Sequence, residues 1–231
     1  MLQIRAANER GKANFGWLDS RHSFSFGSYY DDKHMGHSAL RVINDDTVAP
    51  AAGFGTHGHR DMEIITFVTQ GVIEHKDSMG NVQRLPKGEF QLMSAGKGVT
   101  HSEYNGSKTD ELKFLQIWIE PNVKDGEPGY QQKDFGQTQG LTQVITPTGE
   151  SGTLKIRQQA SVSQLYLATN TNEQLKLVAG RKAYVHVVAG RLQLNGQHLV
   201  GGDGVKIEQL ELLNFSNQSE SPVIALVFDL P

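Results

Sequence analysis

Two short segments of the sequence carry side chains that could share one metal ion. The first is His57-Gly58-His59, and the second is His101-Ser102-Glu103. Residues i and i+2 of a β-strand point to the same face, so each segment projects two ligands to one side. If the two strands are neighbours, three imidazole nitrogens and one carboxylate oxygen converge. This donor set suits a borderline divalent metal and leaves one or two coordination positions open for chemistry.

The alternative is that these are ordinary polar residues on two strands. With nine histidines in 231 residues, a His-x-His pair arises readily by chance. The setting favours the metal site, because both segments lie beside turn glycines. The chain has no cysteine, so any metal must be held by nitrogen and oxygen. That favours Fe, Mn, Co, Ni, Cu or Zn as the ion and excludes sulfur clusters, disulfides and thiol chemistry.

The elements that would position these ligands are β-strands. Apolar runs, many of them alternating, are separated at short intervals by the 25 glycines, and helical periodicity is scarce. This pattern is typical of an all-β sandwich or barrel. Four such runs are residues 64–68, 115–119, 183–188 and 223–228.

One pattern of strand and turn residues occurs twice in the sequence. A strand ends in glycine, a polar β-turn follows, and a second glycine turn precedes the next strand. The glycines that end the two strands are Gly71 and Gly190. We therefore predict two β-barrels in tandem, residues 1–132 and 133–231, joined within the polar, glycine-containing segment 122–139. The second barrel carries no paired ligands, so we expect it to be metal-free.

Composition excludes several classes of function. A net charge of −3 and a pI near 6.3 provide no basic field for nucleic acid or anionic lipid. No run approaches the roughly 20 apolar residues that span a bilayer. The charged N-terminal segment does not have the apolar core of a secretory signal. We expect a cytoplasmic protein without direct nucleic-acid or membrane partners.

Longer motifs around the ligands resemble a known family. His57-x-His59-x3-Glu63 and the later Gly80-x5-Pro86-x-Gly88 are similar to the two cupin motifs. The extension from Pro86 to Glu103 is similar to the pirin branch of the cupin superfamily, and bacterial pirin-like quercetin 2,3-dioxygenases in particular. The resemblance implies a bicupin, two double-stranded β-helix (jelly-roll) barrels, with one metal in the first. It implies that His57, His59, His101 and Glu103 are the ligands and that Glu63 lies outside the ligand set.

The same resemblance implies an activity. A metal-dependent dioxygenase would open the central ring of a flavonol such as quercetin with O2 and release CO, with Fe2+ as the nominal metal. Glu103 is the candidate catalytic base for the flavonol hydroxyl proton. Aromatic and methionine side chains near the ligands are candidates for a pocket for a small aromatic substrate, although barrel interiors are apolar in any case. These candidates are Phe24, Phe26, Phe54, Met62 and Met93.

Other interpretations remain open at this point. Some pirins are metal-binding regulators that contact a transcription factor or a metabolic enzyme, which would give this chain a protein partner. An enzyme acting on an unrelated metabolite is the third possibility. Four further histidines have no partner at strand spacing and are not assigned to the site, namely His22, His34, His37 and His75.

Overall fold

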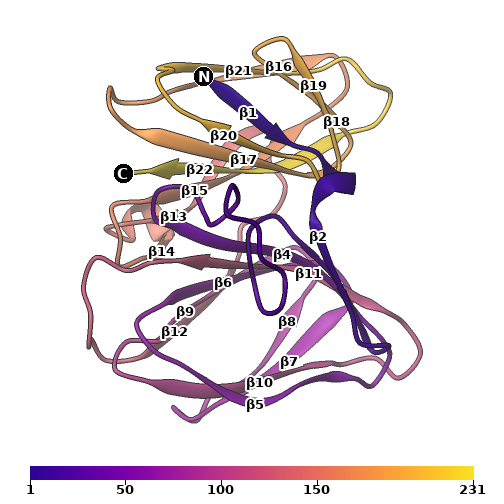
Figure 1. Ribbon diagram of the computed structural model, residues 1–231, viewed down its shortest axis with the longest axis vertical. Helices are drawn as coiled ribbons and strands as arrows, with labels where there is room; N and C mark the ends of the chain where they lie inside the picture. The colour runs from indigo at the N-terminus through magenta and orange to yellow at the C-terminus, as the bar shows by residue number, and fades with distance from the viewer. The chain divides into compact units, whose positions relative to one another are not determined.

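The computed structural model describes all residues from 1 to 231. It contains 22 β-strands, and its only helical elements are the short 3-10 turns η1 (Ala7–Glu9) and η2 (Glu150–Gly152) (Figure 1). The predicted all-β fold class is confirmed. No helix has the length and apolar character needed to cross a membrane.

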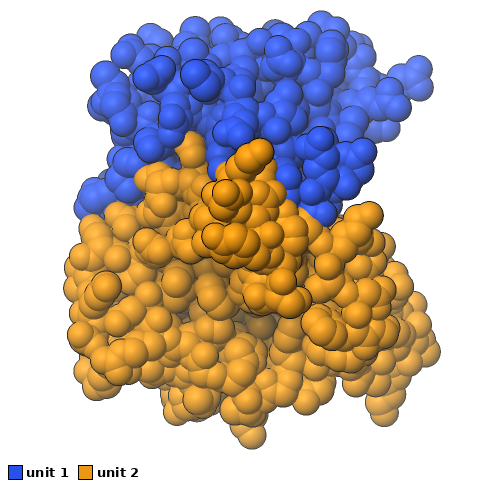
Figure 2. Space-filling model, in the orientation of Figure 1, with its two compact units in different colours: residues 1–10, 137–155, 159–231 blue, residues 11–136, 156–158 orange.

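The chain forms two compact units (Figure 2). We call residues 11–136 with 156–158 the N-terminal unit, and residues 1–10, 137–155 and 159–231 the C-terminal unit. The division after residue 136 lies four residues beyond the predicted one. The first ten residues belong to the C-terminal unit because strand β1 (Leu2–Arg5) pairs with strand β20 (Gly204–Ile207) at the edge of its sheet.

The N-terminal unit consists of a seven-stranded and a four-stranded sheet. The larger sheet has the order β12 (Gly129–Asp134), β9 (Glu89–Ser94), β6 (Glu63–Gln70), β11 (Leu112–Ile119), β4 (Leu40–Val48), β3 (Leu18–His22) and β2 (Gly11–Asn14). The smaller sheet has the order β5 (Gly53–His59), β10 (Val99–Asn105), β7 (Val72–Asp77) and β8 (Val82–Pro86), and Figure 1 shows these four strands side by side.

The C-terminal unit has the same construction. Its larger sheet has the order β1, β20, β17 (Lys182–Ala189), β22 (Val223–Leu230), β15 (Ser161–Leu167), β13 (Gly140–Thr146) and β14 (Leu154–Lys155). Its smaller sheet has the order β16 (Thr171–Lys176), β21 (Leu212–Asn217), β18 (Arg191–Leu194) and β19 (Gln197–Val200).

The repeat predicted from the turn glycines is present in atomic detail. Gly71 and Gly190 both adopt positive φ, +82° and +88°, at the ends of equivalent strands. The side-chain amide of Asn105 donates to three backbone carbonyl oxygens that flank the strands around it, and Asn217 does the same in the second unit. Strand order and these matching hydrogen bonds align the two units residue by residue.

Candidate metal centre

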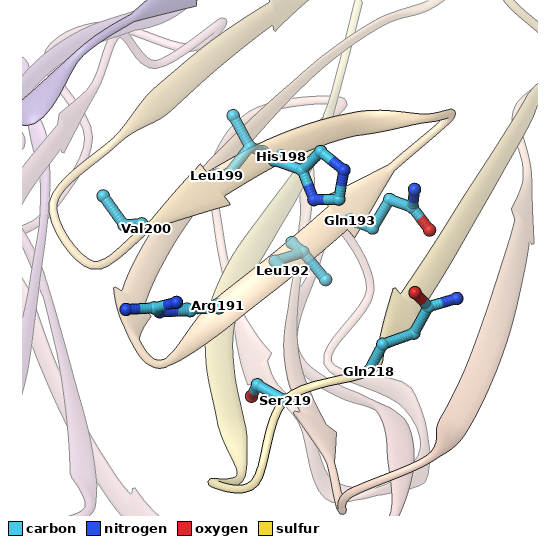
Figure 3. Close-up of a pocket in the computed structure, with 8 residues that line it drawn as sticks. All are labelled: Arg191, Leu192, Gln193, His198, Leu199, Val200, Gln218 and Ser219. Carbon is cyan, nitrogen blue, oxygen red and sulfur yellow. The ribbon is translucent and has the colours of Figure 1, made fainter.

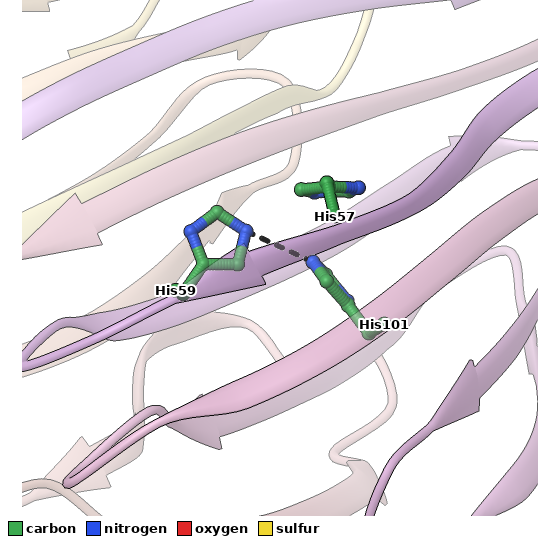
Figure 4. Close-up of side chains that lie close together, drawn as sticks. All are labelled: His57, His59 and His101. Atoms are coloured by element: carbon green, nitrogen blue, oxygen red, sulfur yellow. Dashed lines mark hydrogen bonds between the residues drawn. The ribbon is translucent and has the colours of Figure 1, made fainter.

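Strands β5 and β10 carry the four predicted ligands. The two strands are antiparallel neighbours in which His57 pairs with His101 and His59 with Val99. The register shifts between His101 and Glu103. Figure 4 shows the three imidazole rings converging from the two strands. His101 and Glu103 are buried, whereas His57 and His59 are half-buried.

The three imidazoles have the geometry of a ligand set. Their ligand nitrogens lie within 4.8 Å of one another. The Nε2 atoms of His59 and His101 are 3.0 Å apart, close to the roughly 3 Å expected for two nitrogens at right angles about an ion 2.0–2.1 Å from each. His57 Nδ1 lies 2.8 Å from the carbonyl oxygen of Gly55. A proton on that nitrogen is donated to the carbonyl and leaves the Nε2 lone pair for a metal, a common arrangement in metal sites.

The electrostatics of the rings also suit a metal. Burial lowers the pKa of His101 to about 3, and its neighbours His57 and His59 lower it further in the same direction. Burial and His57 lower the pKa of His59 to about 4. Both rings are therefore neutral at pH 7, and a metal need not displace protons from them.

Glu103 supplies a carboxylate with one unused oxygen. Its Oε2 accepts a hydrogen bond of 3.1 Å from Gln116 Nε2, whereas Oε1 is buried and has no partner within the chain. Burial raises the pKa of Glu103 to about 7, an effect that the Gln116 hydrogen bond reduces and the charge of Asp46 increases. A buried carboxylate oxygen without a donor is costly, and a cation would compensate for it.

Glu103 also belongs to a second group of possible ligands that includes His75. The ligand atoms of His75, His101 and Glu103 lie within 4.8 Å of one another, because β7 pairs with β10 on the side opposite β5. No single group of this kind contains all four predicted ligands. The expectation that His75 has no partner at strand spacing is wrong. His75 Nε2 lies 3.1 Å from Asp77 Oδ2, two residues along β7.

Asp77 holds His75 in a defined orientation. Although burial opposes the shift, hydrogen bonds from Asn81 and His75 lower the pKa of Asp77. The backbone N–H of Met79 also donates to this carboxylate, at 2.9 Å. His75 Nδ1 is buried without a partner. The signal in the sequence was the His75-x-Asp77 spacing, which a search for His and Glu pairs alone does not detect.

Glu63 lies on a different sheet from the predicted ligands. It is buried on β6, where its Oε2 accepts hydrogen bonds from Ser94 Oγ at 2.9 Å and from the backbone N–H of Arg157 at 3.2 Å. Its carboxylate is therefore engaged in holding β6, β9 and residue 157 together.

A cavity of about 440 Å³ opens beside the imidazoles and is lined by His57 and His59. Of the five residues expected to line a substrate pocket, Phe26 and Phe54 line this cavity. Phe24, Met62 and Met93 do not. Phe24 is 1% exposed, and the two methionines pack in an apolar cluster around Ile64 and Val99, because β9 pairs Met93 with Ile64.

Most of the remaining wall residues of the cavity were not predicted from the sequence. One part is aromatic, with the Trp118 ring edge-on to Phe26 at a centroid distance of 5.3 Å and to His59 at 5.1 Å. Another part is polar and comes from β3, β4 and β11. Its members are Ser20, His22, Asn44, Asp46 and Gln116. Although β4 directly precedes β5 and β11 directly follows β10 in the sequence, all three strands belong to the other sheet, and only the topology shows that they face the site.

The equivalent positions in the C-terminal unit carry no donor atoms. In that unit β21 pairs with β16 as β10 pairs with β5. The counterparts of His57, His59, His101 and Glu103 are Leu175, Leu177, Leu213 and Phe215. These side chains pack into or against the apolar core of that unit. An open groove of about 480 Å³ lies at the β18–β19 hairpin of this unit, and Figure 3 shows its scattered polar side chains.

Known proteins resemble both halves of the chain. A family model described as Pirin matches residues 3–119, and one described as Quercetinase C-terminal cupin domain matches residues 143–230. The quercetin 2,3-dioxygenase of Escherichia coli (strain K12) is 46% identical over 231 residues, covering 100% of this chain and 99% of that protein. A pirin-like protein of Caulobacter vibrioides is 36% identical over 97% of this chain and 98% of its own length. The crystal structure of the bacterial pirin YhhW of Escherichia coli in complex with nickel(II) has a TM-score of 0.96 at 44% identity, covering 100% and 99% of the two chains.

Proposed function

This chain belongs to the pirin family, and from that membership we propose that it is a metal-dependent dioxygenase that opens the central ring of a flavonol such as quercetin. The observation that carries the proposal is the cavity of about 440 Å³, which lies directly against His57 and His59. An aromatic cavity with a few polar groups beside a metal site is the usual form of a site for a flat organic substrate.

We propose His57, His59, His101 and Glu103 as the residues that hold the ion. Three neutral nitrogens and one carboxylate oxygen suit Fe2+, our nominal choice for oxygen chemistry, as well as Mn, Co, Ni, Cu or Zn. Nickel is the ion in the complex of the Escherichia coli relative. When bound, a divalent ion would lower the pKa of a coordinated enolic hydroxyl and would orient the flavonol for its reaction with O2.

The side chains of this chain position the substrate and move its proton. Phe26, Phe54 and Trp118 give the cavity flat apolar walls. Glu103 is the candidate base, because its buried carboxylate lies beside the proposed ligand His101. Gln116 fixes the carboxylate through its other oxygen. In the overall reaction, both atoms of O2 enter the opened product and one ring carbon leaves as CO.

The test is turnover by protein loaded anaerobically with Fe2+ or Ni2+ and then mixed with quercetin and O2. We expect the visible absorbance of the flavonol to disappear with one CO released for each molecule consumed. Glu103→Ala and His57→Ala should lose this activity. His198→Ala, which changes an exposed histidine of the C-terminal unit, is the matched control and should retain it.

No turnover by fully loaded wild type above that of the free metal would refute the dioxygenase proposal. A metal-binding regulator with a protein partner would then be the alternative. Turnover of another phenolic compound at a far higher kcat/KM than any flavonol would keep the site and replace the substrate.

A further inference from the structure

A strip of polar side chains crosses the inner face of the larger sheet in the N-terminal unit. Asn44 and Asp46 lie two residues apart on β4 and therefore on one face. Asn44 pairs in register with Gln116 of β11, and Asp46 with Ser20 of β3. All four line the cavity beside the imidazoles. Gln116 is the residue that binds Glu103, so the strip begins at the candidate metal ligands and extends away from them.

The barrel fold does not require polar residues at these positions. The C-terminal unit has the same sheet, in which β15 pairs with β13 and β22 as β4 pairs with β3 and β11. The counterparts of Ser20, Asn44, Asp46 and Gln116 there are Leu141, Ser163, Leu165 and Val227. Leu165 and Val227 are fully buried members of an apolar cluster. At three of the four positions, the polar strip in the N-terminal unit is thus a departure from a packing that the same chain achieves with apolar side chains.

Hydrogen bonding within the chain leaves this strip incomplete. The hydroxyl of Ser20 donates to Asp46. The side chain of Asn44 is 3% exposed, and its Oδ1 is buried with no hydrogen-bond partner. The indole N–H of Trp118, which lines the same cavity, is also buried without an acceptor. A buried polar group without a partner is unusual in a folded protein, and a ligand is one of the standard reasons for it.

We propose that Asn44 and Asp46 bind a hydroxyl group of the substrate other than the one next to the metal, and that they select polyhydroxylated aromatic compounds. The inference rests on the proposed function and names its specificity residues. An aromatic hydroxyl both donates and accepts, so it can pair with the amide of Asn44 and with the carboxyl of Asp46. A site built around such a contact rejects an analogue without the hydroxyl, because its own polar groups are then left unpaired.

The experiment is an anaerobic binding titration of the metal-loaded protein with flavonols that lack one ring hydroxyl at a time. Tryptophan fluorescence is the readout. The chain has two tryptophans, Trp17 and Trp118, and both line the cavity. For wild type we expect removal of one particular hydroxyl to weaken binding at least tenfold. In Asn44→Leu and Asp46→Leu, the same removal should change the dissociation constant less than about threefold.

Two further variants separate recognition from structural damage. Asp46→Asn keeps a donor and an acceptor in place and should retain most of the discrimination. Ser163→Ala changes the counterpart of Asn44 in the C-terminal unit and should bind like wild type. Leu165 is the counterpart of Asp46 in the C-terminal unit and is packed in its apolar core. The fold therefore accommodates leucine at this position.

The proposal is overturned if the leucine variants discriminate as wild type does, or if no single hydroxyl matters to wild type by more than about threefold. Because binding is measured without O2, the result does not depend on turnover. A wild type that binds with hydroxyl preference but never consumes a flavonol would refute the dioxygenase and leave the recognition residues in place.

Discussion

Replacing His101 or Asp46 with leucine should change the stability of the metal-free N-terminal unit in opposite directions as the pH falls. The two side chains are buried, at 1% and 3% exposure, and they titrate in opposite senses. Their counterparts in the C-terminal unit are Leu213 and Leu165, so leucine is the replacement that the fold already accommodates.

The magnitude for His101 follows from its lowered pKa. The folded ring has a pKa of about 3, against 6.5 for an ordinary histidine. Below pH 6.5 the unfolded chain takes up a proton that the folded chain excludes, so this contribution to stability is complete above pH 6.5 and is lost as the pH falls. Each pH unit corresponds to about 1.4 kcal/mol, or about 2 kcal/mol between pH 6.5 and 5. His101→Leu avoids this loss and should gain that amount relative to wild type.

Asp46 works in the other direction. Burial is the main cause that raises its pKa from 3.8 to about 7, against the opposing Ser20 hydrogen bond. As the pH falls through 7, the folded carboxyl takes up a proton before the unfolded one does, so wild type gains stability. Between pH 7 and 5 the gain is on the order of 3 kcal/mol. Asp46→Leu lacks this gain, so its stability relative to wild type should fall over the same interval.

The assay is urea unfolding in the presence of EDTA at pH 7, 6 and 5, followed by tryptophan fluorescence. Both tryptophans belong to the N-terminal unit, so the signal reports that unit alone. Ser163→Ala in the C-terminal unit is the control and should show no pH-dependent difference. If the two leucine variants shift with pH in the same direction, or neither shifts by more than about 0.5 kcal/mol, the assigned burial of charge is wrong.

Three other outcomes are expected. His57→Ala should reduce the metal content retained after dialysis at least tenfold, measured by elemental analysis, whereas Leu175→Ala should retain it; equal content in both would contradict the assigned site. Ni2+ at 100 times its dissociation constant should stabilise the N-terminal unit by about 2.7 kcal/mol in the fluorescence-monitored transition, and EDTA should reverse the effect. Asn105→Ala removes three hydrogen bonds to backbone carbonyls and should lower the stability of that unit by about 2–3 kcal/mol, whereas Asn217→Ala should leave the tryptophan transition unchanged.

The sequence predicted those parts of the site that depend on one strand at a time. His57 and His59 share a face because a strand repeats every two residues, and that rule needs no knowledge of the neighbours. The turn glycines, Gly71 and Gly190, likewise indicated the repeat because a positive φ at a strand end favours glycine locally.

Features that depend on which strands are neighbours could not be predicted. Met93 was expected in the pocket because it lies near His101 along the chain, but β9 belongs to the other sheet and pairs it with Ile64. Asn44 reaches the cavity because β11 is the neighbour of β4, a pairing between segments about 70 residues apart. The transfer of β1 to the C-terminal unit has the same origin, since it depends on the free edge of β20.

The two barrels of the repeat have the same strand order but carry different side chains in their interiors. The C-terminal one places leucine, valine or phenylalanine where the N-terminal one places Glu103, Asp46 and Gln116. Burying such groups opposes folding unless something pairs with them. Because the C-terminal barrel packs apolar side chains at the positions equivalent to these three, the fold does not require polar residues there. The groups that lack partners within the chain, Glu103 Oε1 and Asn44 Oδ1, are the ones to which the proposed ion and substrate would bind.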